Sequence, residues 1–104
     1  MTLPSNELMT AVLDRQVNSS EFWDNSTISV FEINASYDMN IYELQHLMKE
    51  YILSSGFTYK IEADNNSVCI VIYDEYVNTT EFIGYDSEFE AVVRASEFIL
   101  KEIA

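Results

Sequence analysis

A chain of 104 residues is long enough for one domain with a hydrophobic core and too short for two. Hydrophobic residues make up 48% of it, which argues against disorder, and no apolar run approaches the roughly 20 residues that span a bilayer. Eighteen acidic against five basic residues give a formal net charge of -13, which disfavours direct binding to nucleic-acid phosphates.

The first residues lack the basic and apolar segments of a secretory signal, and a single cysteine cannot form an internal disulfide. We therefore expect a cytoplasmic protein. Residues 1–24 are predicted to hold a helix and an aromatic segment. Ser5 can cap a helix that runs to about Val17, with apolar residues at helical spacing along one side. The single tryptophan, Trp23, is expected in the core.

Residues 27–35 predict a strand whose apolar positions change parity near Val30 and Phe31. Such a change indicates a bulge or burial of both faces. Asn40 and Glu43 have the spacing of a helix N-terminal cap, and apolar residues then recur at helical spacing. A second helix is therefore expected over residues 40–55.

Residues 57–84 predict a hairpin followed by a short strand. Residues 57–63 alternate apolar and polar, which is typical of a half-buried strand, and Asp64-Asn65-Asn66 forms a tight turn. Residues 67–73 are apolar on both faces, which is typical of a central strand. Such a strand is either covered on both faces, or covered on one face and bordered by neighbouring side chains on the other. Gly84 marks a bend near the end of the third strand.

Residues 86–103 predict a C-terminal helix that covers the sheet. Ser87 and Glu90 have capping-box spacing, and apolar residues recur every three or four positions after them. The element order is helix, strand, helix, strand, strand, short strand, helix. It predicts a single α+β domain over residues 1–104, with a small, mainly antiparallel sheet of three to four strands and two or three helices packed on it.

No motif in the chain points to catalysis. His46 is the sole histidine, and Cys69 lies in the most apolar strand, where a small buried side chain is expected in place of a nucleophile. Asp64-Asn65-Asn66 opens like a calcium loop, but the glycine and terminal glutamate of the EF-hand pattern are missing. We therefore predict a protein that is not an enzyme and has no cofactor and no metal site.

The interval between Lys60 and Arg94 holds many acidic residues and no basic one. Some of them complement the N-terminal dipole of the last helix, and others stand beside tyrosines. Tyrosines among carboxylates suit an interface that engages arginine and lysine, although a solubilising acidic surface is the alternative. The candidate partner-binding residues are Asp74, Glu75, Tyr76, Glu81, Asp86 and Glu88.

The segment from Tyr85 to Ile99, which follows the hairpin, resembles the close of many small α+β proteins encoded by phages and mobile elements. The short, very acidic, cysteine-poor chain is similar in type to phage inhibitors of host defence, including anti-CRISPR proteins and DNA mimics. The resemblance implies an inhibitor that blocks the basic nucleic-acid-binding surface of a defence or nucleic-acid-processing protein in the host cytoplasm. It assigns no functional residue by position.

Two other functions stay open. An immunity or antitoxin protein would use the same acidic surface to plug the active site of a basic toxin. A structural interaction module would instead form a homodimer through an exposed edge strand.

Overall fold

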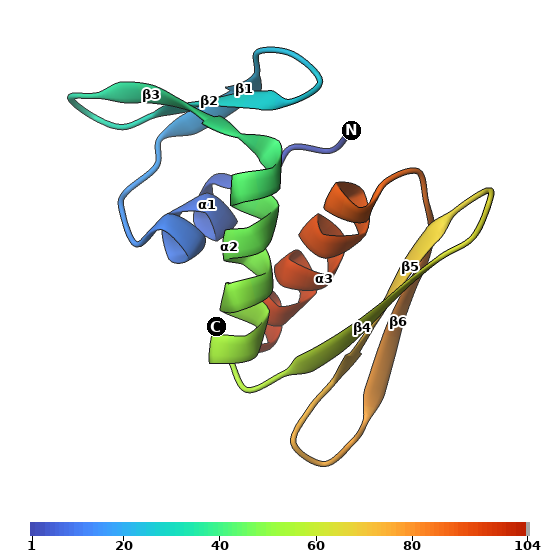
Figure 1. The fold of residues 1–104 in the computed structure, drawn as a ribbon. Coiled ribbons are helices and arrows are strands. Elements are labelled where there is room, and N and C mark those ends of the chain that lie inside the picture. Colours follow the sequence, from blue (N-terminus) through green and yellow to red (C-terminus); the bar gives the residue numbers. More distant parts are fainter. Residues whose placement is uncertain (104) are drawn as a thin grey trace.

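Residues 1–103 are described by the computed structural model of the protein, and they form three α-helices and six β-strands (Figure 1). In chain order the elements are α1 (Asn6–Leu13), β1 (Ser19–Phe22), β2 (Thr27–Phe31), β3 (Ser36–Asn40), α2 (Ile41–Ser54), β4 (Thr58–Ala63), β5 (Val68–Tyr73), β6 (Thr79–Tyr85) and α3 (Glu88–Ile103). Within these residues the strands make two three-stranded antiparallel sheets, β1–β2–β3 (the first sheet) and β4–β5–β6 (the second sheet). The predicted α+β class is confirmed, with the strands divided between two sheets.

Helix α1 is shorter than the sequence pattern predicts. Its N-terminal cap is confirmed, because Ser5 Oγ accepts a hydrogen bond of 3.1 Å from the backbone N–H of Leu8. The helix ends at Leu13, since Asp14 adopts a left-handed conformation with φ of 55°. Val17 lies beyond the helix and is nevertheless buried, with its N–H donating to Thr10 Oγ1.

The first sheet contains two strands that the sequence analysis missed. β1 and β3 flank β2, which ends at Phe31 and not at residue 35, because the chain turns where Glu32 N–H donates to the carbonyl of Ala35. Ile33 and Ala35 therefore lie in a turn and not beyond a bulge. Within β2 the consecutive residues Ile28, Ser29 and Val30 are buried, which agrees with the alternative of burial on both faces. Trp23 lies in the turn between β1 and β2 with 73% of its surface exposed, so its expected core position is wrong.

Helix α2 begins where predicted and lies between the two sheets along the chain. Asn40 Oδ1 accepts a 2.8 Å hydrogen bond from the N–H of Tyr42, which caps the helix. Its inner face carries Leu44, Met48 and Ile52, all fully buried. Gly56, with φ of 90°, provides the left-handed residue that lets the chain leave the helix and enter β4.

The second sheet is the predicted hairpin extended by a full third strand. Asp64 Oδ1 accepts hydrogen bonds from the N–H groups of Asn66 and Ser67, and these bonds hold the β4–β5 turn. In β5, Ile70 and Ile72 face α3 and are buried. The register of β5 with β6 is irregular between Val68 and Ile70, close to Gly84, whose φ is 85°.

Helix α3 lies between α2 and the second sheet (Figure 1). Phe89 packs edge-to-face on Phe22 of the first sheet, with ring centroids 6.2 Å apart. Phe98 packs in the same manner on Phe82 of the second sheet at 5.7 Å. The fully buried positions of α3 between these aromatic pairs complete a core shared by both sheets.

Truncation of β5 on its covered face should destabilise the protein strongly. Ile70 is fully buried under α3, whereas Ile83 on β6 is 68% exposed. We expect Ile70→Ala to lower the free energy of unfolding by about 2–5 kcal/mol. The matched Ile83→Ala change should lower it by less than about 0.5 kcal/mol. Urea denaturation followed by circular dichroism measures both, and equal losses would contradict the assignment of the two faces.

Candidate partner-binding surface

The second sheet has one covered and one uncovered face. Side chains alternate between the faces of a strand, so Cys69, Val71 and Tyr73 of β5 point away from α3. The three helices lie on the other side of this sheet (Figure 1), and all three side chains are half-buried by their neighbours. We call this side the open face. Its residues are Thr58, Lys60, Glu62, Cys69, Val71, Tyr73, Thr79, Glu81 and Ile83.

The first sheet offers an internal comparison, because it has the same antiparallel meander order. On its outer side the central strand presents Thr27, Ser29 and Phe31. Ser29 is buried, and its Oγ donates a 2.7 Å hydrogen bond to Asp38 Oδ1, while Glu21 lies opposite on β1. The central strand of the second sheet instead presents Cys69, Val71 and Tyr73, and an uncovered apolar row of this kind is what a partner surface would bury.

Carboxylates border the apolar row. Across the sheet, Lys60, Val71 and Glu81 lie side by side on neighbouring strands. Lys60 Nζ forms a 2.9 Å ion pair with Glu62 on its own strand, and the hydrogen bond that it donates to Glu62 raises the pKa of the lysine. The charge of Lys60 is therefore offset by its neighbour, and Glu81 has no ion pair with a basic residue among residues 1–103.

The turn between β5 and β6 presents two large side chains at one end of the open face. Asp74 Oδ1 accepts 2.9 Å hydrogen bonds from the N–H groups of Tyr76 and Asn78. Partial desolvation raises the pKa of Asp74, but its bonds to Asn78 and Tyr76 outweigh this effect and leave the pKa below its usual value. Asp74 thus fixes the turn, while Tyr76 and Val77 are 76% and 72% exposed.

Val77 has φ of 63°, which is a strained conformation for a β-branched residue. Because asparagine adopts this conformation more readily, we expect Val77→Asn to raise the free energy of unfolding by about 1 kcal/mol. Val77→Thr serves as the control, since it keeps the branched Cβ and nearly the same volume and so does not relieve the left-handed backbone. Urea denaturation compares the two, and an Asn variant no more stable than the Thr variant would show that the turn is unstrained.

The other end of β6 carries the last two predicted residues, which have different roles. Asp86 is exposed in the loop before α3. Glu88 accepts a hydrogen bond from Gln45 Nε2 and lies 3.4 Å from Lys49 Nζ, so it joins α3 to α2. The seven residues of β6 separate the two ends of the open face by about 20 Å.

The structure therefore divides the six predicted residues. Glu75, Tyr76, Glu81 and Asp86 lie on the open face or at its ends, and Asp74 and Glu88 have structural partners. The sequence analysis missed the apolar centre of this surface, which is formed by Val71, Tyr73 and Ile83. The sequence carried half of the signal, since β5 is apolar at consecutive positions and so presents apolar side chains on both faces.

The acidic charge is left largely uncompensated. Within residues 1–103, four of the five Lys and Arg side chains form an ion pair with one carboxylate each. These pairs are Arg15–Glu32, Lys49–Glu88, Lys60–Glu62 and Arg94–Glu90. In the described part of the chain, fourteen of the eighteen acidic side chains therefore have no Lys or Arg partner.

Residues 1–103 contain no group of three or more His, Cys, Asp or Glu side chains arranged to hold a metal ion. No helix in the same residues has the length and apolar character to cross a bilayer. Comparison of the chain with protein-family models, with curated proteins and with solved structures finds no match in any of the three.

Screening of the carboxylates should stabilise the fold. Raising NaCl from about 10 mM to about 150 mM shortens the Debye length from about 30 Å to about 8 Å, which weakens repulsion between exposed charges. We expect the urea midpoint to rise over this range. A variant with Glu21, Glu43 and Glu102 changed to Gln should show a smaller rise, because it carries less repulsion. A midpoint that falls with salt would contradict the dominance of repulsion.

Proposed function

We propose that the protein is a non-enzymatic acidic inhibitor whose open face docks on the basic, nucleic-acid-contacting surface of another protein and blocks it. The observation that carries this proposal is the uncovered apolar row of β5 with unpaired carboxylates around it. An apolar centre with a polar rim is the usual anatomy of a protein interface. The rim charge selects the partner, because carboxylates pair with arginine and lysine.

The two parts of the surface have different physical roles. Burial of Val71, Tyr73 and Ile83 would supply most of the affinity, since apolar area removed from water drives association. The carboxylates of Glu75, Glu81 and Asp86 would speed the encounter and fix its orientation, because long-range charge acts mainly on the association rate. The strained turn at Val77 supports the same reading, since strain of this kind gathers at functional sites.

A basic partner is favoured over a second copy of the chain. Two copies would each bring a net charge of -13, and like charges placed across an interface oppose association. The partner class in the proposal is a defence or nucleic-acid-processing protein, because a surface that contacts phosphates is rich in arginine and lysine. A phage-encoded inhibitor of the anti-CRISPR type is the specific form that the small size and high acidity favour.

Affinity capture from a lysate of the native host tests the proposal. We expect the wild-type chain to retain one nucleic-acid-processing protein at moderate salt and to lose much of it at high salt. Reversal of Glu75, Glu81 and Asp86 to Lys should abolish capture, and Val71→Ser should weaken it at both salt concentrations. The matched control reverses Glu21, Glu43 and Glu102 to Lys, which gives the same change in net charge away from the open face.

Mass spectrometry of the retained proteins gives the outcome. Equal loss in both charge-reversal variants would show that total charge matters and the open face does not. Capture that is indifferent to ionic strength would refute a charge-selected partner. A complex that contains two copies of this chain and nothing else would favour the homodimeric module.

A further inference from the structure

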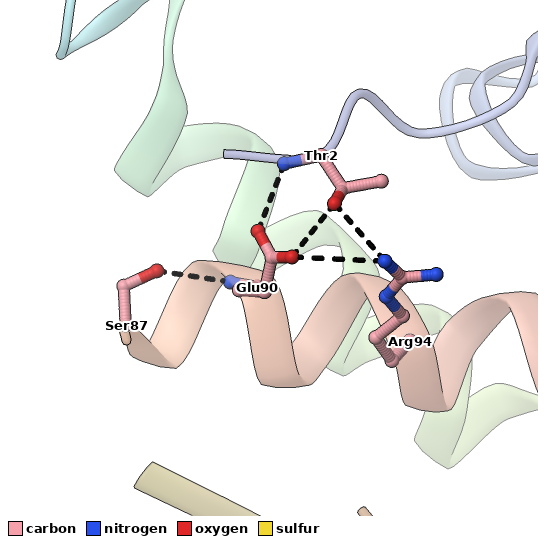
Figure 2. Close-up of polar contacts among 4 residues, drawn as sticks. All are labelled: Thr2, Ser87, Glu90 and Arg94. Atoms are coloured by element: carbon pink, nitrogen blue, oxygen red, sulfur yellow. Dashed lines mark hydrogen bonds and ion pairs between the residues drawn. The ribbon is translucent and has the colours of Figure 1, made fainter. Parts of the chain in front are cut away.

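The first residues of the chain lie along α3 and are held by two of its carboxylates. Thr2 donates to Glu90 through its backbone N–H at 2.8 Å and through Oγ1 at 2.6 Å (Figure 2). Ser5 repeats this arrangement on Glu97, with a backbone N–H bond of 2.9 Å and an Oγ bond of 2.7 Å. Each carboxylate therefore accepts two hydrogen bonds from one residue of the passing segment.

The spacing of the two carboxylates matches an extended chain. Seven residues of α-helix separate Glu90 from Glu97, which is about 10.5 Å along the axis. Three residues of extended chain, the interval from Thr2 to Ser5, also span about 10 Å. Helix α3 thus presents a two-point acceptor site for an extended segment that runs parallel to it.

The two attachment points differ in how firmly they hold the segment. Ser5 is also the N-terminal cap of α1, and the buried Leu8 and Met9 anchor that helix directly after it. Thr2 lies between Met1, which is 57% exposed, and Leu3, which is 38% exposed. The hydrogen bonds to Glu90 therefore hold the beginning of the segment more than burial of its side chains does. Release at Glu90 leaves the cap at Ser5 intact.

Two hollows adjoin the segment at the N-terminal end of α3. One has a volume of about 450 Å³, with Gln45, Glu88 and Phe89 in its wall. The other has a volume of about 330 Å³, with Asp86 and Glu90 in its wall. Met1 and Ser87 line both hollows. The segment therefore lies across what would otherwise be one groove with three carboxylates in its walls.

We propose that residues 1–3, which precede the buried Pro4, form a displaceable strap, and that an extended Lys- or Arg-rich segment of a partner replaces it on Glu90 and fills the groove. The exchange is favourable because Thr2 offers Glu90 neutral donors, whereas an ammonium or guanidinium group makes charge-assisted hydrogen bonds. Arg94, which lies 3.8 Å from Glu90 and donates to Thr2 Oγ1, completes the closed arrangement (Figure 2). The inference rests on the proposed function for the basic character of the partner, but its attachment point, Glu90, lies on α3 and not on the open face, and the two surfaces share Asp86 alone among their named carboxylates.

The experiment titrates the full-length, isotope-labelled chain with an acetylated hexa-arginine peptide at about 150 mM NaCl, where long-range attraction is screened. Chemical shifts locate the peptide, and the exchange rate of the Thr2 amide reports the strap. In the wild-type chain we expect shifts at Ser87 and Glu90 together with faster exchange at Thr2. Thr2→Val removes one donor to Glu90 at nearly constant volume, so it should bind the peptide severalfold more tightly.

Two matched controls separate the strap from general effects. Glu90→Gln should weaken peptide binding severalfold, whereas Glu43→Gln removes the same charge on α2 outside the groove and should not. Thr10→Val removes a hydroxyl that ties α1 to Val17, also outside the groove, and should leave the affinity unchanged. Equal affinities for Thr2→Val and the wild-type chain would show that the strap does not compete with the peptide.

The outcomes also separate this inference from the proposed function. Peptide shifts on Val71 and Glu81 with a Thr2 amide that stays protected would overturn the strap while supporting the open face. Absence of peptide binding would overturn the strap as well, and the capture experiment with the open-face variants would then decide the proposed function by itself.

Discussion

The fold depends on the packing of α3, an amphipathic helix that supplies one core to two separate sheets. Phe89 and Phe98 lie on the same helix and pack on Phe22 and Phe82, which belong to different sheets. A small sheet is stable only when its apolar face is buried, and α3 contributes to that burial in both sheets. The flanks of the same helix carry glutamates that bind α2 and the first residues of the chain. Several acidic residues that suggest binding in the sequence therefore have structural roles.

A protein with this charge must fold against its own repulsion, and the structure divides its carboxylates accordingly. Aspartates at the turns accept backbone hydrogen bonds, as Asp64 and Asp74 do, and these bonds offset the cost of the charge. The remaining carboxylates lie at the surface, where water solvates them. On the open face, acidic residues surround a continuous row of half-buried apolar side chains, and an apolar patch with a polar rim is typical of an interaction site.

Much of the fold could be predicted because its signals are local. Strict alternation over residues 57–63, the Asp64 turn and the Ser87 cap each depend on neighbouring residues, and all three are present in the structure. The strands β1 and β3 were missed because they are short and mostly polar, and they are stabilised by pairing with β2. The hydrogen bonds between Glu90 and Thr2 could not be predicted from local pattern, because the two residues are 88 positions apart in the sequence. Which face of β5 stays uncovered also depends on tertiary packing.

The pairing of strands with their sequence neighbours has a consequence for folding kinetics. Both sheets are meanders, so their hydrogen bonds close short loops and cost little chain entropy. The contacts with the greatest separation join the first residues to α3, over 88 positions at Glu90 and 92 at Glu97. Such contacts form late, after the intervening elements have shortened the effective loop. We therefore expect the two ends of the chain to meet last, once the sheets have formed.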